Sequence, residues 1–272
     1  MCFKTKFEFR RELKDKGIIK LKNFLNGNEL KEIRNIIQFY SAFKNTPKSY
    51  FSINSKHLFY KILKLNFKKL FHDIKILKLA KTKKLGLIAD EIFEKKSYLN
   101  FIDGYFSPIS NKPVLPWHTD QAYHGAEKKT LGFVNPDHFY LKIFIYLTDV
   151  NTNNGCMSYI PFSHKVGYAI RKGIFEEKIK YKPYFTLKEF RDFIKHRDNY
   201  NYIKDQIQND SLIQKFLLKT EFIELGKDSN EFDYKMSAGD AIIFDEGGVH
   251  KGSKTLYSER MVLRYLYSIK KN

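Results

Sequence analysis

Cysteine, arginine and long apolar runs are all scarce in this 272-residue chain, and each scarcity excludes a class of protein. Cys2 and Cys156 are the only cysteines, so neither a disulfide framework nor a cysteine-ligated zinc site is expected. The longest apolar runs, such as AIIF and IFIYL, fall far short of the roughly 18 residues that cross a bilayer. The mixed, charged N-terminal stretch has no apolar signal-peptide core, which predicts a soluble, cytoplasmic protein without a membrane partner.

Arginine supplies only eight of the 49 basic residues, and lysine supplies the other 41, against 30 acidic residues. The resulting net charge of +19 raises the hypothesis of a nucleic-acid or anionic-surface partner. The lysines are scattered, however, apart from residues 68–84, where a basic amphipathic helix or a solvated helix face would both fit. We therefore expect a small-molecule substrate and no nucleic-acid partner, while attraction of an anionic substrate stays open.

The order of hydrophobic patterns predicts one domain, residues 1–272, with helices flanking a β core. Residues 1–97 are mainly helical in their apolar spacing, with a short strand near residue 18 and a helix that begins near Asn28, whose side chain can cap it. Short alternating strands follow over residues 98–268, interrupted by a helical insertion at about residues 165–230. This order is typical of a double-sheet jelly roll. We therefore expect a mainly β fold with flanking helices (α+β), built on a cupin-like double-stranded β-helix.

The stretch PWHTDQAYHG, residues 116–125, places His118 and Asp120 two residues apart. On an extended strand, residues two apart point to the same face, so the imidazole and the carboxylate can converge on one ion. A surface hydrogen bond on a polar strand is the alternative, and two residues alone do not decide between them.

A second histidine changes this balance. His250 follows an apolar strand and a glycine pair in GDAIIFDEGGVHKGSKT, on a distant part of the same expected barrel. Two imidazoles and one carboxylate on one side of an iron ion leave neighbouring coordination positions open for a bidentate cosubstrate and for O₂. Arg260 begins the alternating strand RMVLRYLYSI, and an inward arginine there could hold the distal carboxylate of a keto diacid with its planar fork.

Four stretches together carry a resemblance to a known family: WHTDQAY, LKIFIYLTDVNTNNGCMSYIPFSHKVG, MSAGDAIIFDEGGVHKGS and SERMVLRY. In order and spacing they resemble the phytanoyl-CoA dioxygenase (PhyH-like) family of Fe(II)/2-oxoglutarate oxygenases, over roughly residues 98–268. The N-terminal helix–strand–helix pattern is also similar to the start of that family. The resemblance implies that His118, Asp120 and His250 bind Fe(II), and that Arg260 pairs with 2-oxoglutarate. Arg264, on the same strand face as Arg260, is the alternative anchor.

The same resemblance suggests further contacts. Ser253 is a candidate contact of the cosubstrate, although it follows His250 by three residues where the family often has a serine after two. Asn100 occupies a position where the family often has a polar cosubstrate contact. Tyr123 and His124 are candidates for the lining of the substrate pocket. His164 is expected to have a hydrogen-bonded structural role.

The implied reaction is hydroxylation of an unactivated C–H bond, in which 2-oxoglutarate and O₂ are cosubstrates and succinate and CO₂ are released. Asp120 favours hydroxylation, because halogenating relatives have a small residue at that position. Two other hypotheses remain: a nucleic-acid demethylase of the same iron class, whose target base would have to be flipped, and a cupin-like binding protein without turnover. Residues 165–230 are expected to form a lid, and the primary substrate is not identified.

Overall fold

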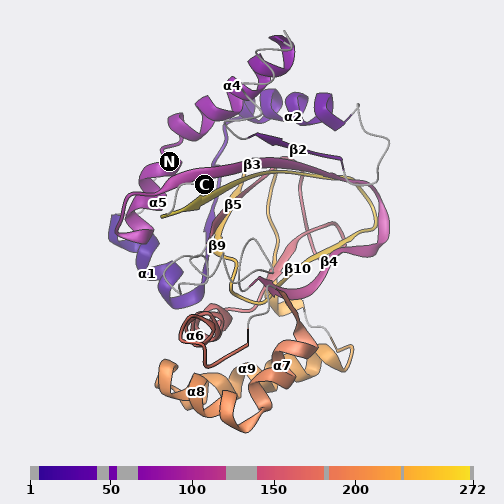
Figure 1. The fold of residues 1–272 in the computed structure, drawn as a ribbon. Helices are drawn as coiled ribbons and strands as arrows, with labels where there is room; N and C mark the ends of the chain where they lie inside the picture. The colour runs from indigo at the N-terminus through magenta and orange to yellow at the C-terminus, as the bar shows by residue number, and fades with distance from the viewer. Residues whose placement is uncertain are drawn as a thin grey trace.

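Two antiparallel sheets lie at the centre of the molecule, and helices cover them from two sides (Figure 1). The computed structural model describes residues 6–41, 49–53, 67–120, 140–180, 184–227 and 230–269. Every strand pair within these ranges is antiparallel. The expected α+β fold with flanking helices is confirmed, although helical residues outnumber strand residues among those described, and the two sheets are consistent with a jelly roll.

The larger sheet has the strand order β1-β9-β5-β11-β3-β2 within the described ranges. Its strands are β1 (Ile18–Leu21), β9 (Ala241–Asp245), β5 (Leu141–Tyr146), β11 (Arg260–Ser268), β3 (Tyr98–Ser107) and β2 (Ser49–Ile53). Strands far apart in the sequence are therefore neighbours, and β5 lies between β9 and β11. This arrangement brings the middle of the chain and its C-terminal strand to the same part of the interior.

The smaller sheet has the order β7-β4-β10-β6-β8. Its strands are β7 (Tyr184–Thr186), β4 (Ser110–Asp120), β10 (His250–Thr255), β6 (Met157–Tyr159) and β8 (Asp233–Tyr234). The two histidine-bearing strands expected from the sequence, β4 and β10, are direct neighbours in this sheet.

Four helices from the N-terminal part cover the outer face of the larger sheet (Figure 1). They are α1 (Lys6–Lys16), α2 (Gly27–Ser41), α4 (Phe67–Thr82) and α5 (Leu85–Phe93). Their apolar faces form one buried cluster with the outward side chains of the sheet, among them Ile143 and Leu263. The described part of residues 1–97 is therefore mainly helical, while its role as a support stays a prediction; residues 1–5, 42–48 and 54–66 lie outside the described residues.

The cap of α2 differs from the expectation. Asn28 lies inside the helix, and Asn26 is the residue that caps it: its Oδ1 accepts from the backbone N–H of Glu29 at 2.9 Å. Glu29 returns the bond, since its Oε2 accepts from the backbone N–H of Asn26 at 2.8 Å. This reciprocal pair is a capping box, and it prevails because it satisfies two otherwise unpaired N–H groups at once.

The helical insertion forms a second layer, next to the smaller sheet (Figure 1). Its helices are α6 (Ser163–Phe175), α7 (Leu187–Lys195), α8 (Arg197–Ile207) and α9 (Asp210–Glu224), followed by a 3₁₀ turn (Asn230–Phe232). The described residues of the insertion are mostly helical, and β7 lies among them and pairs with the end of β4. Three residues are too short for a period-2 pattern to stand out in the sequence, so this strand was not expected.

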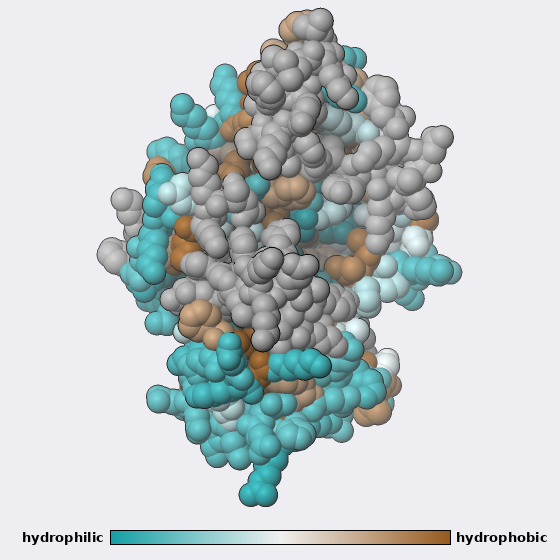
Figure 2. Space-filling model, viewed as in Figure 1, coloured by the Kyte–Doolittle hydropathy of each residue, from teal (hydrophilic) through white to brown (hydrophobic). Residues whose placement is uncertain are grey.

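The surface of the insertion is largely hydrophilic, as the teal colour over its helices shows in Figure 2. Many of its apolar residues face inward and form a separate buried cluster that includes Phe190 and Ile213, whereas others, such as Leu218 and Phe222, are exposed. Among the described residues, no helix combines the length and hydropathy required to cross a membrane.

The space between the two sheets is lined by alternate residues of β5 and β11. Leu141, Ile143 and Ile145 belong to the outer cluster under the helices, so Lys142, Phe144 and Tyr146 point the other way. By the same alternation Arg260, Val262 and Arg264 of β11 share one face, and Val262 packs in the inter-sheet cluster with Tyr146 and Phe244. Strands β5 and β11 therefore present three cations, Lys142, Arg260 and Arg264, to the interior.

Candidate active site

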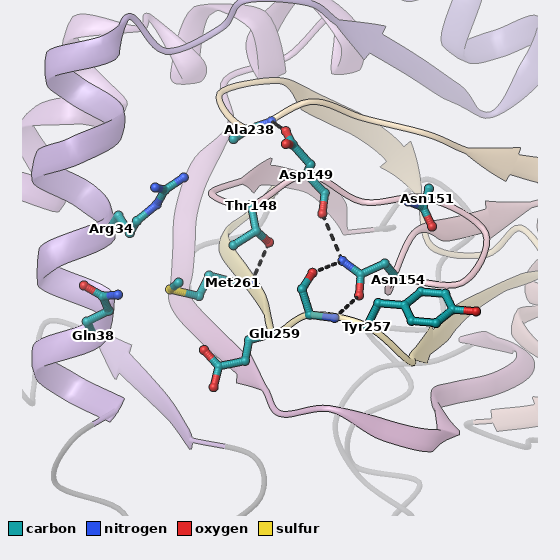
Figure 3. A pocket seen from close by; sticks show the side chains of 11 residues that line it. Arg34, Gln38, Thr148, Asp149, Asn151, Asn154, Ala238, Tyr257, Glu259 and Met261 are labelled. Atoms are coloured by element: carbon teal, nitrogen blue, oxygen red, sulfur yellow. Dashed lines mark hydrogen bonds between the residues drawn. The ribbon is translucent and has the colours of Figure 1, made fainter.

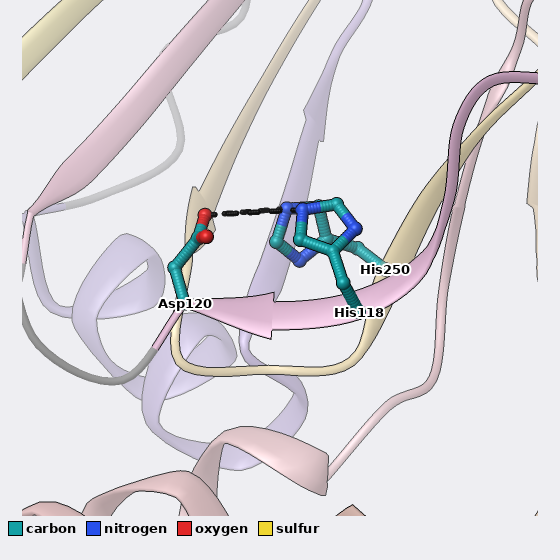
Figure 4. A group of neighbouring side chains, drawn as sticks. All are labelled: His118, Asp120 and His250. Atoms are coloured by element: carbon teal, nitrogen blue, oxygen red, sulfur yellow. Dashed lines mark ion pairs between the residues drawn. The ribbon is translucent and has the colours of Figure 1, made fainter. Parts of the chain in front are cut away.

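His118 and His250 are cross-strand partners in the antiparallel pair of β4 and β10. This register puts their ring centroids 4.2 Å apart. Asp120 follows two residues after His118, on the same strand face, and its Oδ2 lies 3.9 Å from Nε2 of each histidine (Figure 4). One ligand atom from each of these three residues lies within 4.8 Å of the other two. The structure thus brings together the three residues that the sequence singled out.

Hydrogen bonds to the backbone set the orientation of both imidazoles. Nδ1 of His118 lies 2.8 Å from the carbonyl oxygen of Pro116, and Nδ1 of His250 lies 2.8 Å from that of Gly248. A carbonyl oxygen can only accept, so each Nδ1 carries the proton. Each Nε2 then has its lone pair available on the side that faces Asp120, as a metal ligand requires.

The turn before His250 is fastened to the end of β4. Thr119 donates its hydroxyl to the carbonyl oxygen of Gly247 at 2.7 Å, and the backbone N–H of Asp120 donates to the carbonyl oxygen of Glu246 at 3.2 Å. A Cβ at Gly247 would lie 1.9 Å from Nη1 of Arg171, and a Cβ at Gly248 would lie 1.9 Å from the Tyr159 hydroxyl. The glycine pair is therefore required by close packing, and this packing fixes where His250 begins its strand.

Lys142 reaches the site from the opposite sheet. Its Nζ lies 2.9 Å from Oδ2 of Asp120 and 3.0 Å from Oε2 of Glu246. The side chain is buried, with 6% of its surface exposed. Sequence reasoning missed this residue, although a lysine in the apolar strand LKIFIY is a signal, because a buried ammonium needs a charged partner.

Burial and neighbouring charges shift the pKa values of Asp120, His118 and His250, and each shift favours the protonation state that can bind a metal. Burial raises the pKa of Asp120, but Lys142 and then the two histidines outweigh it and hold that pKa well below its usual range. Burial, with a smaller effect of His118, lowers the pKa of His250 to about 3. Burial likewise lowers the pKa of His118, against the opposing influence of Asp120. Near neutral pH the imidazoles are therefore neutral and the carboxylate ionised.

Lys142 itself keeps its charge. Burial lowers the pKa of its ammonium, but the carboxylates of Asp120 and Glu246 more than compensate, and the pKa is raised above its ordinary value. The site therefore combines an ionised carboxylate, two neutral imidazoles and a buried ammonium group.

Arg260 is buried, and its Nε has no hydrogen-bond partner among the described residues. The guanidinium carbon lies 5.9 Å from the ring centre of Tyr146, whose hydroxyl is also buried without a partner there. Burial raises the pKa of Tyr146 to about 12, so this hydroxyl keeps its proton and can donate. Buried donors that the chain itself does not satisfy are uncommon, and an arginine beside a tyrosine fits a carboxylate from outside the chain.

Arg264 is occupied by the chain itself. Its Nε donates to Oδ1 of Asp103 at 2.7 Å and its Nη2 to Oδ2 at 2.5 Å, a bidentate pair across β11 and β3. This fork is therefore filled by a buried carboxylate, in contrast to that of Arg260.

Two of the predicted cosubstrate contacts lie elsewhere. Strand alternation puts Ser253 on the face opposite to His250, and its Oγ lies 3.5 Å from both Cys156 Sγ and Ser158 Oγ. Asn100 donates from Nδ2 to Oγ of Ser268 at 2.5 Å, at the register shift between β3 and β11. The described contacts do not connect either residue to the histidine–aspartate cluster.

The remaining residues singled out in the sequence are Tyr123, His124 and His164. Tyr123 and His124 lie outside the described residues. His164 is buried, and its Nε2 lies 3.0 Å from the carbonyl oxygen of Lys14, which agrees with the expected structural role.

A polar surface cavity of about 530 Å³ lies near the far end of β5 from Lys142 (Figure 3). Arg34, Asp149, Asn154 and Glu259 are among its lining residues. Several of these groups already bond one another: Asn154, for example, accepts from the backbone N–H of Ser258 at 2.9 Å. His118, Asp120 and His250 are not among its lining residues, so the cavity is separate from the histidine–aspartate cluster.

Comparison with known proteins agrees with the geometry. The sequence profile of the family described as phytanoyl-CoA dioxygenase (PhyH) matches residues 13–256. No curated protein sequence matches the chain.

Several solved structures are similar in fold. The carbocyclase SnoK from nogalamycin biosynthesis, described as non-heme and alpha-ketoglutarate-dependent, has a TM-score of 0.59 at 14% identity, covering 98% of this chain and 84% of that one. The epimerase SnoN in complex with Fe³⁺, alpha-ketoglutarate and nogalamycin RO has a TM-score of 0.58 at 13% identity, with 97% and 83% covered. HygX from Streptomyces hygroscopicus, with nickel, 2-oxoglutarate and hygromycin B bound, has a TM-score of 0.54 at 13% identity, with 95% and 85% covered.

Proposed function

Because this chain belongs to the phytanoyl-CoA dioxygenase family, we propose that it is an Fe(II)/2-oxoglutarate-dependent oxygenase that hydroxylates an unactivated C–H bond of a small metabolite. The observation that carries the proposal is the cluster of His118, Asp120 and His250, whose facing nitrogen and oxygen atoms fit a two-histidine, one-carboxylate iron site.

The three ligand residues would hold Fe(II) on one side. Both Nε2 atoms and Oδ2 of Asp120 lie on adjacent strands, and the Nδ1 bonds to the backbone keep both rings turned toward the ion. When bound, iron and 2-oxoglutarate supply an oxidation in which O₂ and 2-oxoglutarate are consumed, succinate and CO₂ are released, and a C–H carbon gains a hydroxyl group. The protein's part is to leave coordination positions open, to orient the substrate and to exclude water.

Arg260 is the proposed anchor of the distal carboxylate of 2-oxoglutarate. Its guanidinium is buried among the interior side chains and is not matched by a carboxylate of the described residues, whereas Arg264 is paired with Asp103. The Tyr146 hydroxyl beside it is a second donor of the same kind. Ser253 and Asn100 remain weaker proposals, since their described contacts are with other side chains.

The proposed substrate is a small molecule, and the net charge of +19 favours an anionic one. HygX binds hygromycin B and SnoN binds nogalamycin RO, which supports a small-molecule pocket on this fold. We propose that the insertion, about residues 165–230, acts as the lid, since its strand β7 pairs with β4 at His118 and Asp120.

A second outcome of the same chemistry is supported by the neighbours, because one is an epimerase and another a carbocyclase. Removal of a hydrogen from a C–H bond begins all three reactions, and the fate of the carbon distinguishes them. A product that gains one oxygen indicates hydroxylation, and a loss of two hydrogens indicates oxidative ring closure. An isomer of unchanged mass indicates epimerisation, which needs an added reductant for the two electrons that O₂ takes beyond those of 2-oxoglutarate.

The test begins with the protein reconstituted with Fe(II) without oxygen, to which 2-oxoglutarate is titrated. We expect a visible charge-transfer band that saturates with the cosubstrate, followed by succinate release when O₂ and a metabolite pool are added. The variant His196→Ala, which removes an exposed histidine at the boundary of α7 and α8, is the matched control and should behave as wild type. Absence of both the band and succinate would reject the oxygenase proposal in favour of a binding protein without turnover.

A further inference from the structure

A lysine inside strand β5 is the least expected residue of the site. Lys142 is buried, and burial of a charged group costs free energy of desolvation unless the charge is paired. Among its partners are Asp120, at 2.9 Å, and Glu246, at 3.0 Å. Glu246 is also buried, with 1% of its surface exposed, and its Oε1 accepts from the backbone N–H of Tyr140 at 3.2 Å.

The oxygen that accepts from Lys142 is the one that faces the histidines. Oδ2 of Asp120 lies 2.9 Å from Nζ of Lys142 and 3.9 Å from each Nε2. A carboxylate oxygen has two lone-pair directions, so Oδ2 can accept the ammonium proton on one side and bind a metal on the other. Lys142 therefore need not leave for the metal to bind, and it fixes the direction in which the second lone pair points.

The charges of Lys142 and Glu246 cancel. A lone ammonium at this distance from the ligand oxygen would repel a divalent cation, and a lone second carboxylate would attract it and offer a further ligand. The pair contributes a net charge of zero, so that the site retains the character of one carboxylate and two imidazoles.

We propose that Lys142 and Glu246 form a charge-neutral positioning pair that holds Asp120 as the single carboxylate ligand and thereby sets the metal affinity of the site. This inference rests on the proposed metal-binding function of His118, Asp120 and His250. The residues are positioning residues, because they act on the metal through Asp120 and through their charge.

The proposal predicts that loss of Lys142 and loss of Glu246 change the affinity for a divalent metal in opposite directions. Lys142→Met leaves Glu246 as an uncompensated anion next to the site, so the affinity for a divalent metal should rise by about tenfold or more. Glu246→Gln removes one negative charge and leaves the ammonium with Asp120, so the net charge beside the metal site rises by one and the affinity should fall by about tenfold or more. The double variant removes both charges and should return to within about threefold of wild type.

The experiment is a calorimetric titration of Ni²⁺ into the metal-free full chain, repeated with Co²⁺ so that the visible absorption reports any change in the ligand set. Thermal unfolding of each metal-free variant shows whether it is folded. The matched control is the ion pair of Lys83 and Glu29, which lies 2.6 Å apart on the N-terminal helical layer. Lys83→Met and Glu29→Gln should leave the affinity for Ni²⁺ unchanged.

The outcomes separate this inference from the proposed function. If wild type binds no metal, the proposed function fails. If wild type binds but both single variants lower the affinity together, the pair has only a structural role and the inference fails; unchanged affinities overturn it equally. If Lys142→Met does not fold, Lys142→Gln takes its place, because it removes the same charge and must also raise the affinity for Ni²⁺.

Discussion

The two sheets that enclose the interior contribute opposite kinds of side chain to one site. The smaller sheet presents His118, Asp120 and His250, which donate electron pairs. The larger sheet presents cations from β5 and β11, namely Lys142, Arg260 and Arg264. The first set fits a metal ion and the second fits carboxylates.

The donor side chains of the smaller sheet and the cations of the larger sheet differ in the partners that each set has in the folded chain. The three donors of the smaller sheet converge within 4.8 Å of one another. The cations of the larger sheet point to separate places: Lys142 is matched by Asp120 and Glu246, and Arg264 by Asp103. Arg260 is the cation of this set whose buried nitrogen is left without a partner among the described residues. A carboxylate ligand is therefore expected at Arg260, and a metal at the opposite sheet.

Removal of the donors should have the largest effect. His118→Ala or His250→Ala should weaken Fe(II) binding by about 1,000-fold or more, because one of three ligands is lost, and should abolish succinate formation. Asp120→Ala should also abolish turnover while retaining weak binding through the two imidazoles. Anaerobic calorimetry with Fe(II) measures the affinities, with His196→Ala as the exposed-histidine control. Wild-type succinate formation in either histidine variant would refute the assignment of the ligands.

The two arginines of β11 should behave differently. Arg260→Lys keeps the charge but replaces a planar fork with a point donor, so a bidentate carboxylate contact is lost. Truncation of such a pair costs about 2–4 kcal/mol, which predicts an apparent 2-oxoglutarate affinity about 30- to 700-fold weaker. Fe(II) binding should survive. Titration of 2-oxoglutarate into the anaerobic Fe(II) protein follows both properties.

Arg264→Lys is the comparison variant on the same strand face. Its partner Asp103 is buried, so this change should lower the free energy of unfolding while the 2-oxoglutarate affinity changes much less. Urea unfolding measures the former. A strong loss of affinity at Arg264 with a weak one at Arg260 would assign the carboxylate anchor to the other arginine.

The smallest effect concerns pH. In the folded, metal-free protein the pKa of His118 is lowered and that of His250 falls to about 3, both chiefly through burial. Below an unfolded pKa of about 6.5, the unfolded chain gains protons that the folded chain does not, so stability falls as the pH decreases from that value. For His250 the loss should be on the order of 2 kcal/mol at pH 5.

Urea unfolding of the chelator-treated protein at pH 7 and pH 5 measures this loss. His250→Gln should show a shallower dependence on pH than wild type, whereas His196→Ala should retain the wild-type dependence. Equal slopes in wild type and His250→Gln would contradict the buried, neutral imidazole.

Much of the fold was predictable because its signals are local. Alternation of apolar residues predicted strands within residues 97–106, 138–150 and 260–269, and the spacing of His118 and Asp120 places them on one face of any strand. The turn before β9 was likewise expected, and Gly239 adopts a φ of +93° there. The family's motif residues then pointed to His250 from a distant part of the chain.

The tertiary structure decided what depends on partners far apart in the sequence. It inserted β7 beside β4, where an unpaired edge required a partner. The cap of α2, by contrast, is local: Asn26 and its reciprocal partner Glu29 are three residues apart, and this spacing in the sequence is the signal that could have identified Asn26.

The sequence by itself determined the α+β class and the three residues of the candidate metal site, because strand period and motif spacing are present in the chain before it folds. Only the tertiary structure distinguished Arg264, filled by Asp103, from Arg260, and only it placed Lys142 between Asp120 and Glu246. The reason is physical: whether a buried charge is satisfied depends on which strands become neighbours, and β5, β11 and β4 meet only in the folded chain.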